Sequence, residues 1–166
     1  TNVPYIVAIP GYRVYVSGIF ELGESEWRDK FVFGFNWRNF NRLETKFPAK
    51  PDQDFVIEMD QSVPVLSGIQ EVDTARLNSF LDDISLLTVD DFVPTTPALD
   101  SLSKTNPTIS ILVLDIGGRQ YLLQLYAGDE KTMHYFGTIN GDQWARFNKN
   151  KIAGIVRGRG FFQKPR

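Results

Sequence analysis

The sequence predicts an α+β fold in which mostly antiparallel β-meanders pack on one main helix, residues 73–87. Three observations lead to this class. One segment has the three-and-four spacing of apolar side chains that is typical of an amphipathic helix. Short runs rich in β-branched and aromatic residues surround it. The turns between these runs are too short for parallel crossovers, so antiparallel pairing is expected.

The helix is predicted from one apolar face and from its start signals. Asp73 is the expected N-cap, and Val72 with Leu77 stands where a hydrophobic staple forms. Burying the face would contribute on the order of 10 kcal/mol, whereas ordering the segment costs roughly 15 kcal/mol or more. The helix must therefore lie on another apolar surface, which its neighbours in sequence indicate is a sheet. The apolar face consists of Leu77, Phe80, Leu81, Ile84 and Leu87.

The N-terminal part of the chain is expected to supply several strands. Residues 5–9 and 12–17 flank Pro10-Gly11, the pattern of a hairpin. Residues 40–47 alternate between apolar and charged side chains, which predicts a strand with one wet face. The further expected strands are 31–35, with Gly34 at a bulge, 55–59 and 63–66.

The C-terminal part is expected to continue the meander. Residues 109–116 are almost continuously apolar, and Gly117-Gly118 predicts a two-residue turn into a strand over 121–126. Asn140-Gly141 predicts a type I′ hairpin turn. The strands on either side of that turn are 133–139 and 144–147, and a short helix weakened by Gly154 is expected over 149–156.

The domain organisation follows from composition. Residues 1–166 are predicted to form a single domain. The prolines and the Ser/Thr cluster of 93–107 are typical of a linker, which would join sub-halves 1–92 and 108–166. Each sub-half would consist of strands followed by a helix, although the two sequences do not align convincingly.

Composition excludes several chemistries. The chain has no Cys, which excludes disulfides, thiolate nucleophiles and Cys-ligated metals. It has no run of eighteen apolar residues, so no transmembrane segment is expected. The start at Thr1, without a leader, is expected for a mature or trimmed exported protein. No cofactor and no nucleic-acid partner are expected.

Charge is distributed unevenly. The net charge is −2, yet all six charged residues from Lys149 onward are basic. Such a tail suits an acidic protein or another anionic envelope component, and the alternative is a solvated end that complements an acidic body. Phe161 and Phe162 are expected to dock the tail on that body. The candidate partner-binding residues are Lys149, Lys151, Arg157, Arg159, Phe161, Phe162 and Trp144.

Candidate catalytic residues are few. His134 is the only histidine, so Ser–His or His-metal chemistry would have to use it, but its strand setting favours a packing residue. Asp82-Asp83 and Asp90-Asp91 are the carboxylate pairs that a carbohydrate-active hydrolase would use. Adjacent acids on a helix surface more often serve solubility. The hydrolase is kept as an alternative function.

Aromatic side chains supply a second alternative. They would stack on sugar rings or on a small ligand if they were exposed, and they would form cross-strand pairs in the core if they were buried. The residues concerned are Trp27, Trp37 and Trp144, with Tyr12, Tyr15 and Tyr126.

Three stretches taken in order resemble a known family. They are 27–33 leading into 40–47; 54–57 followed by the helix and Asp91-Phe92; and 135–137 with 140–142. The chain resembles an uncharacterised family of exported bacterial proteins, a domain of unknown function related to the type found beside gliding-motility auxiliary transport components. The resemblance implies a periplasmic or outer-envelope location and is compatible with a lipid anchor before Thr1. It brings no active site, so the preferred function is a non-enzymatic interaction or scaffold module.

Overall fold

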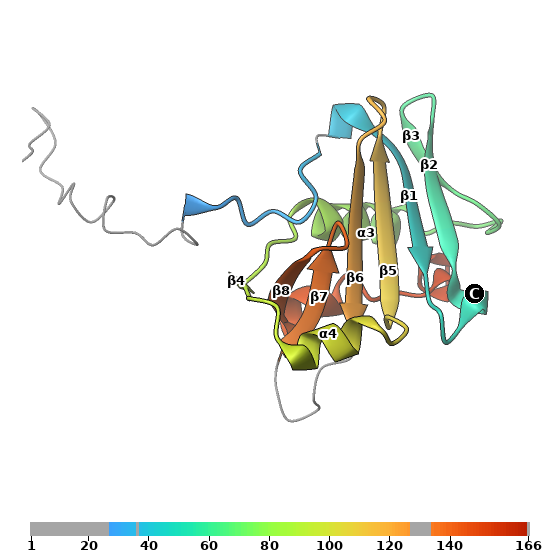
Figure 1. Ribbon diagram of the computed structural model, residues 1–166. Coiled ribbons are helices and arrows are strands. Elements are labelled where there is room, and N and C mark those ends of the chain that lie inside the picture. The colour runs from blue at the N-terminus through green and yellow to red at the C-terminus, as the bar shows by residue number, and fades with distance from the viewer. Residues whose placement is uncertain (1–26, 36, 127–133, 166) are drawn as a thin grey trace, which may run out of the picture.

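Eight strands form one antiparallel sheet in the computed structural model, which describes residues 27–35, 37–126 and 134–165. The strand order is β3-β2-β1-β5-β6-β7-β8-β4 (Figure 1). The strands are β1 (Phe40–Lys46), β2 (Phe55–Asp60), β3 (Val63–Leu66), β4 (Asp91–Phe92), β5 (Ile109–Asp115), β6 (Gln120–Tyr126), β7 (His134–Ile139) and β8 (Gln143–Asn148). This architecture agrees in outline with the predicted α+β class and is richer in strand than in helix.

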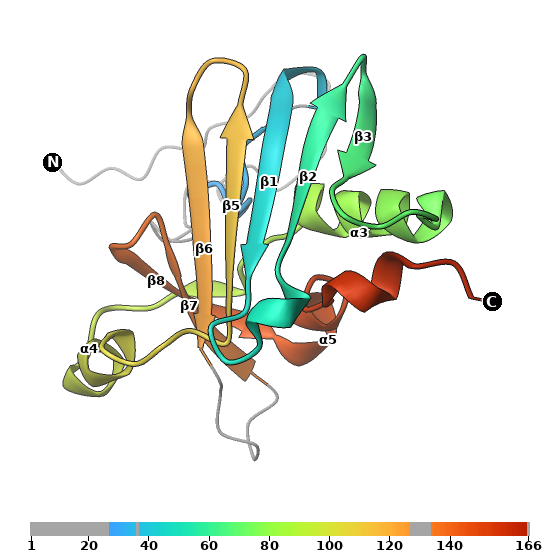
Figure 2. The same cartoon turned by 90° about the vertical axis from the view of Figure 1, so that its right-hand side faces the viewer.

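Short helices and turns complete the described part of the chain. The helices are α3 (Thr74–Ser85), α4 (Pro97–Ser103) and α5 (Lys149–Ala153), and the 3-10 turns are η1 (Trp37–Asn39), η2 (Pro51–Gln53) and η3 (Arg159–Phe162). Helices α3 and α5 lie on one face of the sheet, and α4 lies on the other (Figures 1 and 2). None of these described helices is both long enough and apolar enough to cross a bilayer.

The two expected sub-halves share the sheet. Strand β1 pairs with β5, with Leu43 opposite Val113, so the strands before and after residues 93–107 are direct neighbours. Strand β4 follows α3 in the chain but pairs with β8 at the far edge of the sheet, with Phe92 opposite Ala145. The chain therefore crosses from one half of the sheet to the other before its second meander begins.

Helix α3 forms where the sequence predicts it. The Asp73 carboxylate accepts a hydrogen bond from the Arg76 amide at 3.1 Å, which satisfies an amide of the first turn. The apolar face of α3 is buried, and Phe80 meets Phe55 of β2 at a ring-centroid distance of 5.6 Å. Helix and sheet thus share an aromatic contact in the core.

The C-terminal segment completes that contact. The side chain of Phe162 is fully buried, with its ring 4.9 Å from Phe55 and 5.2 Å from Phe80. The backbone is fastened as well, because the Asp73 amide donates to the Phe162 carbonyl at 2.8 Å and Val72 forms a bridge with Gln163. The expectation that the tail docks on the body is confirmed for Phe162.

The strand expected over 31–35 is wrong in its extent. Only Phe31 forms a bridge, with Thr88, and the Val32 amide donates to the Leu87 carbonyl at 3.0 Å. Val32 and Phe33 are buried as expected. These two side chains are buried because they pack against the main core, without the backbone hydrogen bonds of a strand. Apolar content alone does not distinguish the two situations.

The segment expected to be a linker, 93–107, contains helix α4. Thr96 caps this helix by accepting from the Leu99 amide at 3.3 Å, and Pro97 occupies the first turn, where its missing N–H costs nothing. The same residues that suggested a linker are therefore helix-start signals. Leu99 is buried against β6 and β8, which a solvated linker would not be.

The two predicted turns differ in outcome. Asn140 and Gly141 have φ of 54° and 87°, the positive values that a type I′ turn requires. The loop is one residue longer than predicted, because Ile139 pairs with Gln143 and residue 142 is therefore part of the loop. The turn at 117–118 is wider than predicted. Strand β5 ends at Asp115 and β6 begins at Gln120, and of the two glycines only Gly118 has a positive φ. The hairpin expected over 5–17 lies outside the described residues.

Replacing Phe162 by Ala is expected to lower the free energy of unfolding by about 3–5 kcal/mol, because it opens a cavity between β2 and α3. Urea denaturation followed by circular dichroism measures the loss. Phe161→Ala, at a half-buried position, serves as the matched control and should cost clearly less. Equal losses in the two variants, or a loss under about 1 kcal/mol for Phe162→Ala, would contradict the central role of this ring.

Gly141→Val is expected to destabilise the protein by about 1–3 kcal/mol, since a β-branched side chain would have to adopt a positive φ. Gly160→Ala is the control, because a Cβ at that position meets no atom within 4 Å and its φ is not positive. Thermal melts of both variants give the comparison. An unchanged midpoint for Gly141→Val would mean that the turn relaxes freely.

Candidate functional site

The expected tail residues are placed in quite different environments. Phe162 lies inside the core and is not available to a partner. Phe161 is half-buried, with the guanidinium of Arg157 stacked 4.7 Å from its ring centroid and that of Arg76 at 5.4 Å. Arg157 and Phe161 therefore pack on each other, which is an intramolecular use of both residues.

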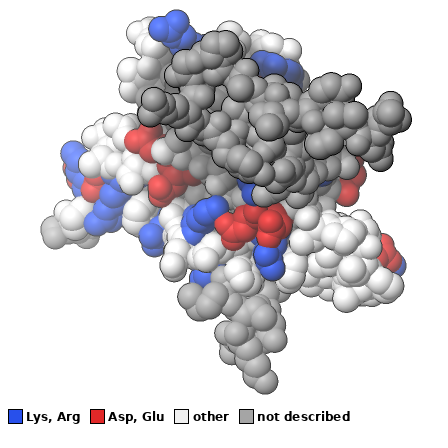
Figure 3. Space-filling view, turned by 90° about the vertical axis from the view of Figure 1, so that its left-hand side faces the viewer, with Lys and Arg blue, Asp and Glu red and all other residues white. Residues whose placement is uncertain are grey.

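Several of the tail cations already have partners. The Lys151 ammonium lies 2.6 Å from an Asp90 carboxylate oxygen and 3.2 Å from the Thr88 hydroxyl. Arg159 donates to the Gly68 carbonyl, and Lys149 is exposed. On the visible part of the β4–β8 side of the molecule, basic and acidic side chains are intermixed (Figure 3). The partner-binding role of these cations stays a prediction.

Trp144 lies on the other face of the sheet from Phe162. It is 5% exposed, and its ring is 5.4 Å from that of Tyr126, in a small cluster beneath Leu99 of α4. The fold thus does not bring Trp144 together with the tail residues. Among the aromatics considered for ligand stacking, Trp27 is exposed, whereas Trp144 and Tyr126 are buried.

The candidate acid–base residues do not converge. Asp82 and Asp83 are exposed on α3, while Asp90 pairs with Lys151 and Asp91 pairs with Arg146. His134 is half-buried on β7, and its Nδ1 atom has no hydrogen-bond partner among the described residues. No group of three or more His, Asp or Glu side chains in the described ranges is arranged to hold a metal ion.

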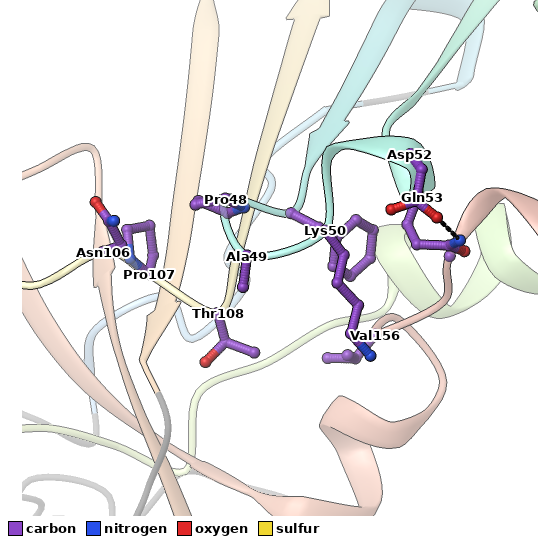
Figure 4. A pocket seen from close by; sticks show the side chains of 11 residues that line it. Pro48, Ala49, Lys50, Asp52, Gln53, Asn106, Pro107, Thr108 and Val156 are labelled. Atoms are coloured by element: carbon purple, nitrogen blue, oxygen red, sulfur yellow. Dashed lines mark hydrogen bonds between the residues drawn. The ribbon is translucent and has the colours of Figure 1, made fainter.

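A groove of about 870 Å³ opens at one end of the sheet. One wall is the β1–β2 loop with Lys50, and the opposite wall is the loop that enters β5, with Asn106 and Thr108 (Figure 4). Val156 and Gly158, which follow α5, complete the lining. Three segments far apart in the sequence build this groove, so no local motif could have indicated it.

A second surface is the uncovered part of the sheet. In Figures 1 and 2 none of the described helices covers β1, β2 and β5 on the face opposite α3. On β5, Ile111 and Val113 are buried and point to the core, so Leu112 and Leu114 point to this open face and are half-buried. Leu122 of β6 lies opposite Leu112 and extends the apolar row.

Charged side chains border this apolar row. Arg42 on β1 is paired with Leu114 in the register, and its Nε lies 2.8 Å from Glu44. The same guanidinium also pairs with Glu58 of β2, whose side chain is 48% exposed. One arginine is therefore shared by two carboxylates, and Lys46 of β1 is a further outward cation on this face.

Asp115 and Arg119 form the described ion pair with the most deeply buried carboxylate. The Asp115 side chain is 1% exposed and lies 2.6 Å from the Arg119 Nε. The pKa of Asp115 lies below its ordinary value, chiefly because the Arg119 backbone amide donates to the carboxylate. Burial of the carboxyl group opposes this by raising the pKa, and the Arg119 side chain lowers it further. This pair closes the β5–β6 turn and is structural, because both groups serve the hairpin.

Comparison of the chain with protein-family models, with curated proteins and with solved structures finds no match. The sites described here therefore depend on geometry alone. The unbroken apolar stretch 111–114 was the one sequence signal for the open-face row, because a strand buried on a single face should alternate.

Asp115→Asn is expected to lower stability at neutral pH and to have a shrinking effect in acid. The folded-state pKa is depressed below the ordinary value of about 3.9, so the carboxylate contributes stability above that pH and loses it as the pH falls through the folded pKa. Urea midpoints measured from pH 7 to pH 2 should therefore converge for the two proteins. Asp82→Asn, at an exposed position, is the control; a gap between wild type and Asp115→Asn that does not depend on pH would refute the assignment.

Proposed function

We propose that this protein is a non-enzymatic interaction module of the bacterial cell envelope that binds a partner protein on the open face of its sheet. The observation that carries the proposal is the outward apolar row of Leu112, Leu114 and Leu122 on β5 and β6. The envelope location depends on the sequence resemblance. The interaction surface depends on the arrangement of these side chains.

An antiparallel sheet with one solvated face normally carries polar side chains on that face. Strand β1 follows the rule, since its outward residues are Arg42, Glu44 and Lys46. Strands β5 and β6, two of the inner strands of the sheet, break it with three leucines. Apolar side chains in the middle of an open sheet favour a surface that is covered by another protein in use.

The surroundings of the row match the layout of a protein interface. Such interfaces have an apolar centre and a polar rim. Here the rim is the Arg42–Glu44–Glu58 group on one side and the amides of Gln120 and Gln124 on the other. Because Arg42, Glu44 and Glu58 place charges of both signs beside the leucines, the complementary partner surface presents apolar side chains next to polar or charged ones.

The two edges of the sheet are less suited than the open face to binding a partner, which would have to add a strand there. Strand β3 is one edge of the sheet. The Ser67 amide donates to the Val56 carbonyl, and hydrogen-bonded pairs alternate along an antiparallel ladder. The backbone groups of Ser67, Val65 and Val63 therefore point toward β2. The N and carbonyl of Pro64 then face outward, and proline offers no N–H to an added strand. The other edge is β4 itself, which pairs with β8 over only two residues and so offers a partner strand few backbone groups.

A photo-crosslinking amino acid at position 114 is expected to trap a specific protein in envelope extracts. The double variant Leu112→Lys with Leu122→Lys should reduce that adduct at least tenfold, because it places charge in the apolar centre and adds no new contact. Gln120→Lys with Gln124→Lys is the matched control, since it adds the same charge at the rim of the same face. Circular dichroism verifies that each variant is folded.

Three outcomes would count against the proposal. In the first, no adduct forms; in the second, the adduct persists in the leucine double variant while the fold is intact. An adduct with twice the mass of the chain would identify a second copy as the occupant and would refute binding of a different protein.

A further inference from the structure

We propose that the groove at the end of the sheet is a binding site for the C-terminal carboxylate of a peptide whose last side chain is apolar. This site is distinct from the open face. It is built by the β1–β2 loop, the loop before β5 and the segment after α5, and it contains none of the leucines of the open-face row.

Lys50 supplies the charge for this recognition. No carboxylate of the described residues lies within ion-pair distance of its ammonium. The acid in the lining, Asp52, accepts a hydrogen bond from the Gln53 side-chain amide at 2.6 Å through its Oδ2 and keeps its negative charge, so carboxylate recognition depends on the end of the Lys50 side chain that lies away from Asp52. In Figure 4 the Lys50 side chain extends along the groove toward Val156, away from Asp52. An unpaired ammonium within a groove attracts an anionic group.

Polar groups on the opposite wall suit a peptide backbone. The Thr108 amide is already bonded to the Leu125 carbonyl at 2.7 Å, so its exposed hydroxyl is the group left for a ligand. Asn106 beside it is exposed and offers both an amide donor and a carbonyl acceptor. A terminal peptide unit, with one N–H and one C=O, has the matching pair of groups.

The remaining lining is apolar and fits a side chain. Phe47, Pro107 and Val156 are half-buried in the groove, between the lysine wall and the polar wall. Gly158 borders the Gln53 side chain, and a Cβ at this position would meet the Gln53 Oε1 atom. The volume of about 870 Å³ is within the range of small-ligand sites and holds more than a lone anion needs.

The chemistry distinguishes a peptide end from a simple carboxylate. A small fatty acid would use Lys50 and the apolar lining but would leave Asn106 and Thr108 without partners. A peptide terminus uses all three kinds of group at once. The recognition elements are a carboxylate, an adjacent peptide unit and an apolar side chain.

Titration of the isotopically labelled protein, followed by two-dimensional NMR, tests the proposal. The probe is the N-acetylated tripeptide Ala-Ala-Val as the free acid, compared with the same tripeptide as its C-terminal amide and with isovalerate. We expect the free acid to shift the backbone amides of Lys50, Thr108 and Val156. The amide form and isovalerate should each bind at least fivefold more weakly.

Lys50→Met isolates the charge. It should weaken binding of the free acid to the level of the amide form, and an unchanged spectrum elsewhere verifies the fold. Lys104→Met is the matched control, because Lys104 on the neighbouring α4–β5 connection is paired with Asp100 and is absent from the groove lining. That variant should bind like the wild type.

Each other outcome overturns the proposal. Absence of shifts at millimolar peptide excludes the site, and equal affinity for acid and amide excludes carboxylate recognition. Binding of isovalerate as tight as that of the peptide excludes the peptide as the ligand. The Leu112→Lys, Leu122→Lys variant should bind the tripeptide normally, so failure of the open-face interaction and failure of this site are separable.

Discussion

The contact among Phe55, Phe80 and Phe162 is central to the molecule, because it joins three parts of the chain that lie far apart in the sequence. Phe55 belongs to the sheet, Phe80 to α3 and Phe162 to the C-terminal segment, and their rings are arranged edge to face. Helix α3 is too short to be stable alone. It is stable here because its apolar face is covered by the sheet on one side and by the returning tail on the other.

This arrangement leaves the sheet asymmetric. The face with α3, α5 and η3 is a conventional core, whereas on the opposite face the described residues place one helix, α4, over β6 and β8. The open-face leucines and the end groove both follow from that asymmetry. The first is a surface that no described element covers, and the second forms where loops at the end of the sheet meet the segment that returns after α5. Neither requires a catalytic residue.

Much of the fold could be predicted locally, and the failures have common causes. Helix α3, its Asp73 cap and the Asn140-Gly141 turn depend on neighbours within a few residues, so their patterns were sufficient. The linker prediction did not anticipate the helix that begins at Thr96-Pro97, because this pair serves equally as loop punctuation and as a helix start. Trp144 is named with the tail residues as a candidate for partner binding, although it lies on another strand face. Its position on β8 places it on the opposite face from Phe162, because successive strand residues alternate.

The sequence by itself determined the antiparallel strands, the main helix and the docking of an aromatic tail, because hydrophobic spacing and turn residues act over short distances. Only the tertiary structure decided which face of each strand is covered and how loops at 47–53, 106–108 and 156–158 enclose a groove. It also decided that the basic residues of the tail are mostly engaged within the chain, as Lys151 is with Asp90. These features depend on strand order, and the order β3-β2-β1-β5 brings together residues more than fifty positions apart that no local pattern connects.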